Sequence, residues 1–335
     1  KSEWAVSGNT VHFVWAENEN KDYYPEVGFR VLYRRSTDGG ATWEDARTLC
    51  TRRLDHINYM QQWNGYSNMM QVEGNTIHLL VPDNYDSRST NNVGGMLVYL
   101  RSTDNGATFT TTYLDTLKST SQKIEESVIR VEGQNIVIVA KEEGLNDSIA
   151  LYRSTDGGNT FTSNHIFVQH SVTHIGGLDM NGGRWAVVSN YFFNDYTTGY
   201  NDNGYVYVTA GDMHSDNFTI SQLAPQLADD TYRCSLNKLS QNFISGVYGD
   251  VNYHSLIAMT DANTIHVLFT GEYRTDATEP SMDHTLYIRS TDGGATWSAI
   301  QPIADATATH AAQTLGIQPC SVLLGSTGVI GPQLP

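Results

Sequence analysis

The octapeptide STDGGATW stands at Ser36–Trp43 and returns unchanged at Ser290–Trp297. Two close variants lie between these copies, STDNGATF at Ser102–Phe109 and STDGGNTF at Ser154–Phe161. Four near-identical copies indicate an internal repeat. Each copy follows an apolar stretch that ends in Tyr and Arg, namely VLYRR, LVYLR, ALYR and TLYIR. We therefore expect a β-strand to enter every copy.

The centre of each octapeptide is typical of a tight turn. Asp-Gly-Gly and Asp-Asn-Gly tolerate positive φ angles, which hairpin turns require. The Asp carboxylate can accept hydrogen bonds from the turn's own amides, while the Ser and Thr hydroxyls close the loop and the final aromatic packs beneath it. This chemistry predicts structural rather than catalytic carboxylates at Asp38, Asp104, Asp156 and Asp292.

The pattern S-x-D-x-G-x-T-W/F resembles the Asp box of the bacterial neuraminidase repeat families, which include the sialidases. In those families the box forms the turn between the third and fourth strands of a propeller blade. The resemblance implies an all-β fold, a β-propeller of four-stranded antiparallel blades with Asp-box turns. We expect six blades, with five as the alternative.

A second repeated phrase precedes the boxes and reads as the second strand of each blade: GNTVHFVWAE, GNTIHLLVPD, GQNIVIVAKE and ANTIHVLFTGE. The long interval between the third and fourth boxes indicates a blade whose box has degenerated to DMHSDNF. We predict one domain over residues 1–335. Its blades are expected at about 1–50, 64–117, 123–168, 174–225 and 232–303, with a partial sixth at 304–335.

Composition narrows the range of possible functions. The 335 residues carry a formal net charge of −16, which disfavours a nucleic-acid partner because phosphate binding needs clustered Lys and Arg. No run of 18 apolar residues occurs, so membrane insertion is not expected, and the first residues are not a signal peptide. The chain reads as a mature secreted or extracellular protein. Cys50, Cys234 and Cys320 leave one disulfide, or buried thiols, as open readings.

In a propeller, the ends of the second strands converge on the face opposite the third-to-fourth-strand turns, and we expect the functional site there. Resemblance to sialidases implies a Tyr nucleophile paired with a Glu, an acidic acid/base and cations that grip a carboxylate. On this basis Tyr253, Glu272, Asp83 and Glu126 are the catalytic candidates. The substrate-binding candidates are Arg53, Arg233, Arg274, Lys141 and Tyr191.

Two other functions fit the same residues. A polysaccharide lyase would use His and Tyr to remove a proton beside a uronate, with His56, His174 or His254 as the base. A binding or scaffold propeller would hold a glycan without catalysis. No cofactor is expected. The loops Asp83–Asn92 and Asn194–Asn203 offer oxygen ligands for Ca²⁺, but they lack the EF-hand spacing. The oligomeric state stays open.

Overall fold

The structure is a computed structural model. It describes residues 2–18, 27–54, 70–83, 96–116, 123–143, 148–166, 174–195, 200–223, 256–272 and 283–302. These residues form five four-stranded antiparallel sheets, which we number as blades 1 to 5. The predicted all-β propeller fold is therefore confirmed. Residues 304–335, where the sequence predicts a partial sixth blade, lie outside the described residues.

Each blade follows the same up-and-down order along the chain. Blade 1 contains β1 (Ser2–Ser7), β2 (Thr10–Asn18), β3 (Val27–Ser36) and β4 (Arg47–Leu54). Blade 2 contains β5 (Met70–Glu73), β6 (Thr76–Asp83), β7 (Met96–Ser102) and β8 (Thr110–Thr116). Blade 3 contains β9 (Lys123–Glu132), β10 (Asn135–Glu143), β11 (Ser148–Ser154) and β12 (Thr162–Ile166).

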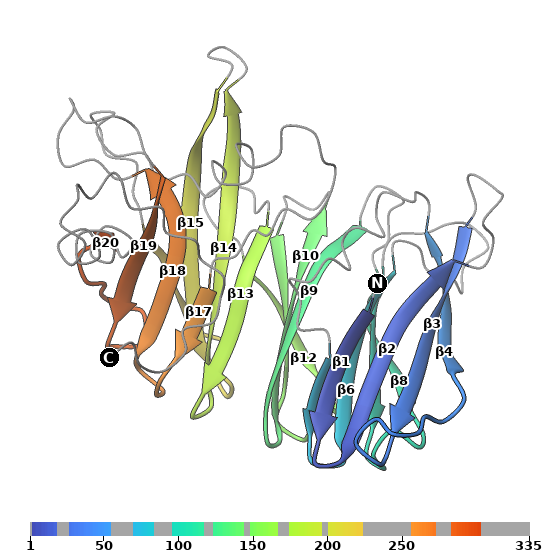
Figure 1. Ribbon diagram of the computed structural model, residues 1–335. Coiled ribbons are helices and arrows are strands. Elements are labelled where there is room, and N and C mark those ends of the chain that lie inside the picture. The colour runs from blue at the N-terminus through green and yellow to red at the C-terminus, as the bar shows by residue number, and fades with distance from the viewer. Residues whose placement is uncertain are drawn as a thin grey trace, which may run out of the picture.

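Blades 4 and 5 continue the pattern. Blade 4 contains β13 (His174–Asn181), β14 (Arg184–Asp195), β15 (Tyr200–Asp212) and β16 (Phe218–Gln222). Blade 5 contains β17 (Leu256–Met259), β18 (Ile265–Glu272), β19 (Asp283–Ser290) and β20 (Gln301–Pro302). The first strands of neighbouring blades lie side by side in the order β1, β5, β9, β13 and β17 (Figure 1).

The blades are held together by apolar seams. Successive side chains along the second and third strands point to opposite faces of the sheet. Each blade therefore presents one row of side chains to the preceding blade and one row to the next. Between blades 2 and 3, for example, Leu80 and Leu97 pack with Ile136 and Ile138, all fully buried or nearly so. Equivalent clusters join blades 1 and 2, 3 and 4, and 4 and 5. The core is therefore distributed over the seams rather than gathered in one centre.

The Asp box closes as the sequence predicts. In the first copy, Asp38 Oδ1 accepts the Ser36 hydroxyl at 2.7 Å and the Thr42 amide at 2.8 Å, and Oδ2 accepts the Thr42 hydroxyl at 2.5 Å. These bonds favour the ionised carboxylate, so the Thr42 hydroxyl, followed by the Thr42 amide, lowers the pKa of Asp38 to about 2. The same bonds recur at Asp104, Asp156 and Asp292.

A Tyr of one blade supports the box of the next. The hydroxyl of Tyr33 lies 2.7 Å from Nδ1 of His12 in its own blade, and its ring meets the edge of Phe109, the box aromatic of blade 2. Tyr99 repeats this arrangement with His78 at 2.6 Å and with Phe161 of blade 3. Each tyrosine therefore contacts both its own blade and the next one.

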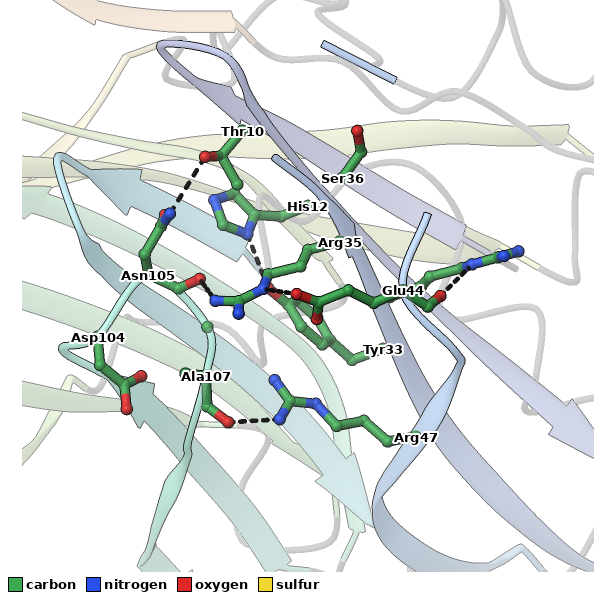
Figure 2. Close-up of polar contacts among 12 residues, drawn as sticks. Thr10, His12, Tyr33, Arg35, Ser36, Glu44, Arg47, Asp104, Asn105 and Ala107 are labelled. Atoms are coloured by element: carbon green, nitrogen blue, oxygen red, sulfur yellow. Dashed lines mark hydrogen bonds and ion pairs between the residues drawn. The ribbon is translucent and has the colours of Figure 1, made fainter. Parts of the chain in front are cut away.

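Arginines add polar bonds across the same seam. Arg35 donates to the Asn105 carbonyl oxygen at 2.5 Å, and Arg47 donates to the carbonyl oxygen of Ala107 (Figure 2). The Arg47 guanidinium also lies over the ring of Phe109 in blade 2, 5.7 Å from its centroid. Blade 1 therefore grips the box turn of blade 2 through both backbone and ring contacts.

Blade 4 keeps the architecture without a box. β15 ends at Asp212 and β16 begins at Phe218, so the turn DMHSDNF joins a third and a fourth strand. Arg153 of blade 3, whose side chain is 3% exposed, donates to the carbonyl oxygens of Asp212 at 3.1 Å and of Ser215, and pairs with Asp216. The arginine of the preceding blade thus holds a turn that has lost its own carboxylate network.

One backbone bond is common to all five blades. The turn between the third and fourth strands donates an amide to the turn between the first and second strands of the same blade. The five pairs are Gly39 to Asn9, Asn105 to Asn75, Gly157 to Gln134, Met213 to Gly183 and Gly293 to Asn263, at 2.8–3.0 Å. Both turns therefore lie at one end of every blade, and the second strands run from that end toward the opposite face.

Candidate functional site

Three blades carry a carboxylate at the same place on the second strand. Val11, Ile77 and Ile136 each pair with the first Ser of a box. Six residues further along stand Glu17, Asp83 and Glu142. At about 3.3 Å per residue these positions lie about 20 Å from the box end of the blade. The equivalent residue of blade 4 is Tyr191, six residues after Trp185, and in blade 5 Glu272 lies one residue beyond the equivalent Gly271.

Glu17 is half-exposed and has two partners. Its Oε1 accepts the indole N–H of Trp15 at 2.9 Å, and its Oε2 lies 3.5 Å from the Arg30 guanidinium. The ion pair is exposed at both ends, so its contribution to stability is small. A solvent-facing carboxylate beside an indole ring is suited to contact a sugar, because the ring can stack and the carboxylate can accept hydroxyl hydrogens.

Glu142 is fully buried and anchors a polar cluster at the end of blade 3. Its Oε2 accepts the Ser148 hydroxyl at 3.2 Å and lies 3.1 Å from Nε2 of His165. The His165 side chain is 41% exposed. A buried carboxylate behind an accessible imidazole fixes the orientation of the ring. The cluster therefore presents an oriented imidazole at the surface.

Two residues predicted from the sequence are brought together at the same end of blade 3. Glu126 on β9 and Lys141 on β10 are cross-strand partners. Lys141 is 7% exposed, and its other cross-strand partner is the buried Ile149. Val139, two residues earlier, packs in the seam with blade 4, so Lys141 lies on the blade 4 side and Glu142 on the blade 2 side.

Charged groups of different blades also meet on the first strands. Nε of Arg130 lies 3.6 Å from Oδ1 of Asp179 on the neighbouring blade, and Asp179 Oδ2 accepts the Met259 amide at 2.7 Å. Burial lowers the pKa of Arg130, while the charges of Asp179 and Glu3 act in the opposite direction. Blades 3, 4 and 5 are thus linked by one polar chain along their inner strands.

The remaining predicted residues are placed by backbone position alone. Asp83 pairs with Met96, Glu272 with Asp283, and Arg53 with Gly28. Tyr191 pairs with Tyr205 in blade 4. Other named residues lie outside the described residues: Tyr253, Arg233, Arg274, His56, His254, Cys234 and Cys320.

No group of three or more His, Cys, Asp or Glu side chains with metal-binding geometry occurs among the described residues. Of the two loops considered for Ca²⁺, residues 84–92 and 196–199 lie outside that part of the chain. Within the same residues, no helix has the length and apolar character needed to cross a membrane.

Sequence reasoning did not select His165, Ser148, Arg130 or Asp179. His165 stands on an outer strand, three strands away from the axis, and its neighbour Glu142 is 23 residues earlier. Arg130 and Asp179 were visible as charges between two apolar neighbours on first strands, which is the signal that could have found them. Their meeting depends on how two blades are placed, and no local pattern reports that.

Comparison with known proteins supports the repeat. The family described as BNR/Asp-box repeat matches residues 288–299, which span the end of β19 and the fourth box. No curated protein sequence matches the chain. The chain carries Asp boxes on a β-propeller, as the sequence predicts.

Similar solved structures include propellers of several kinds. An ulvan lyase of polysaccharide lyase family PL25 is 12% identical, with 88% of this chain and 69% of that chain covered and a TM-score of 0.45. The propeller domain of the Trilobed protease from Pyrococcus furiosus is 8% identical, with 91% and 72% covered and a TM-score of 0.43. A sialidase from Trypanosoma rangeli is 10% identical, with 86% and 45% covered and a TM-score of 0.40. At these identities the likeness concerns the fold alone.

Proposed function

We propose that the protein is a carbohydrate-active propeller that hydrolyses glycosidic bonds at the face opposite its Asp boxes. The observation that carries the proposal is the set of carboxylates Glu17, Asp83 and Glu142 at one register position of three consecutive blades. Glycoside hydrolysis needs carboxyl groups as acid and as base or stabiliser, and repetition by blade supplies them around one face. An extracellular location, where glycans are abundant, is part of this proposal.

The finer proposal is a sialidase-like mechanism. Tyr253 would attack the anomeric carbon, Glu272 would take the phenolic proton, and Asp83 would protonate the leaving oxygen. Glu126 would hold its cross-strand partner Lys141, while Arg53, Arg233 and Arg274 would bind the substrate carboxylate and Tyr191 would contact the sugar. A lysine ammonium is a single point charge, whereas an arginine guanidinium can bind both oxygens of a carboxylate. Binding of the acidic sugar through Lys141 would therefore be weaker than through an arginine.

The test is turnover of a fluorogenic sialoside and of a panel of neutral aryl glycosides. Glu272→Gln and Asp83→Asn should each lower kcat by about a hundredfold or more, because an acid or base is removed from the transition state. The matched control is Asp292→Asn, which changes a carboxylate at the box end and should leave kcat unchanged while lowering the melting temperature. Activity on neutral glycosides alone would support a glycoside hydrolase and contradict the sialidase-like mechanism. Equal loss in all three variants would place the site elsewhere.

A second candidate is a polysaccharide lyase, which the Glu142–His165 pair favours. An accessible imidazole held by a buried carboxylate is suited to remove a proton beside a uronate. Absorbance from unsaturated uronate products, measured with plant and algal polysaccharides, tests it. His165→Gln should then abolish product formation and leave the fold intact. Binding on a glycan array without turnover of any substrate would instead assign a binding propeller.

A further inference from the structure

Blades 1 and 2, and likewise blades 2 and 3, meet through one repeated interface. The face toward the next blade carries a His–Tyr pair and an Arg, and the face toward the preceding blade carries an apolar row with the box turn. A Cβ built on Gly106 would lie 1.9 Å from the Tyr33 hydroxyl, and one built on Gly158 would lie 2.2 Å from that of Tyr99. The receiving box thus has a glycine where the tyrosine of the preceding blade arrives.

Blade 1 has a receiving face that none of blades 2 to 5 covers. Trp4 stands at the register position of Met70 and Ile129, since these residues pair with Phe13, Leu79 and Ile138 respectively. Trp4 is 67% exposed, whereas Met70 is 5% exposed and Ile129 is fully buried. Val6, on the same face, is 52% exposed. A Cβ built on Gly40, the box glycine of blade 1, meets nothing within 4 Å.

Blade 5 has the opposite half of the interface and presents it outward. His266 Nδ1 lies 2.7 Å from the Tyr287 hydroxyl, as in blades 1 and 2. Tyr33 and Tyr99 are each 1% exposed, but Tyr287 is only half-buried, and the nearby Arg289 is exposed. The two ends of the row of blades therefore carry complementary, uncovered faces.

The composition of residues 303–335 suits them to fill the space between these two uncovered faces, which we call the seat. The segment follows β20 directly, and from Ala306 to Pro335 it contains no Asp, Glu, Lys or Arg, in a chain of net charge −16. Its stretch GIQPCSVLLG, residues 316–325, is mostly apolar. Removing the apolar side chains of such a stretch from water lowers the free energy, and the same holds for Trp4 and Val6. We propose that residues 303–335 pack between the outer faces of blade 5 and blade 1 and cover Trp4 and Val6.

The seat would be filled by apolar contact rather than by the tyrosine interface. Residues 303–335 contain neither Tyr nor Arg, so they supply no ring for the space at Gly40. The covering segment would therefore join the row of blades without repeating the blade pattern. This occupant is distinct from a second copy of the chain, whose blade 5 could bring Tyr287 and Arg289 to the same face.

Cross-linking in the full chain tests the proposal. With Cys50 and Cys234 changed to Ser, Cys320 is the one native thiol, and Val6→Cys adds a second on the blade 1 face. Mild oxidation should give a disulfide within one chain, seen as a shifted monomer band that reduction reverses. The matched control is Ile220→Cys on β16, a position that is 39% exposed and away from the seat, which should not cross-link. Disulfide-linked dimers through Val6→Cys would assign the seat to a second copy.

Thiol labelling gives an independent readout. With Cys320 also changed to Ser, a maleimide should label Val6→Cys about tenfold more slowly than Ile220→Cys, because the first is covered. Leu323→Lys together with Leu324→Lys should remove that protection and leave labelling of Ile220→Cys unchanged. Equal labelling rates for the two cysteines in the otherwise unchanged chain would overturn the proposal.

Discussion

The hydroxyl of Tyr33 occupies the space that a side chain at Gly106 would need, although the two residues belong to different blades. The same tyrosine is bonded to His12 and packed on Phe109, so it has little room to move. Gly106 also has a φ of 80°, in the left-handed region. Two separate physical reasons therefore demand glycine at this point.

Substitution of the two box glycines separates these reasons. Gly40→Ala carries the cost of a positive φ alone, about 1 kcal/mol, because nothing lies near its Cβ. Gly106→Ala adds the collision with Tyr33 and should cost about 1–3 kcal/mol more. Urea unfolding of both variants measures the difference. Equal destabilisation would mean that the tyrosine can move aside without loss.

Acid should destabilise the seam between blades 2 and 3 through His78. Burial, followed by the charge of Arg101, lowers the pKa of His78 from 6.5 to about 4. Between these values the unfolded chain binds a proton that the folded chain does not, so stability falls as the pH falls from 6.5 to 4. The box carboxylates respond in a lower window, since the pKa of Asp38 falls from 3.8 to about 2.

Blade 3 supplies the variant that tests this. Val137 and Leu151 stand, fully buried, at the positions that His78 and Tyr99 occupy in blade 2. The double variant His78→Val with Tyr99→Leu should fold and show a shallower loss of stability between pH 6.5 and 4. His12, whose pKa is also lowered by burial, keeps part of the slope. An unchanged slope in urea midpoints across this range would contradict the assignment.

Glu132 links blades 3 and 4 at their inner turns. Its two carboxylate oxygens accept the amides of Gly182 and Gly183, both at 2.9 Å. Glu132→Ala should cost about 1–3 kcal/mol, because two charge-assisted bonds are lost. Glu73→Ala, which removes a single bond to the Gly133 amide at 3.0 Å, is the matched control and should cost less. The two free energies of unfolding, measured in urea, decide the order.

Arg153 should be hard to replace even by lysine. Its buried guanidinium bonds the carbonyl oxygen of Asp212 and also Asn164 and Asp216. Lysine offers one compact charge in place of a planar fork, so Arg153→Lys should lower the melting temperature by several degrees. Arg101→Lys removes a single exposed bond to Asn159 and should have little effect. Similar melting temperatures for the two variants would show that the fork is unimportant.

The strands and turns of this fold are predictable because their signals are local. An Asp box closes on its own residues, from Ser36 to Thr42, and the strand before it ends in the same Tyr and Arg each time. Even blade 4, which has no box, was visible as a strand pair followed by the turn DMHSDNF.

The candidate site was less predictable because its contacts join different strands and blades. The sequence indicated that the second strands end in carboxylates, but not that Glu142 would be buried against Ser148 and His165. Nor did it indicate that Lys141 would be nearly covered beside Ile149. Burial at these points is decided by how each blade is rotated against its neighbour, which involves residues far apart in the chain.

The backbone bond between the two turns of each blade bears on how such chains diverge. Blade 4 retains it through the amide of Met213, although Gly211 stands where the other blades have the first Ser of the box. A main-chain donor is present whatever the side chain, so mutation can erase the signature while the geometry is inherited. Counting boxes therefore undercounts blades, and distant propellers of this kind will be recognised through coordinates after their sequences no longer reveal a common ancestry.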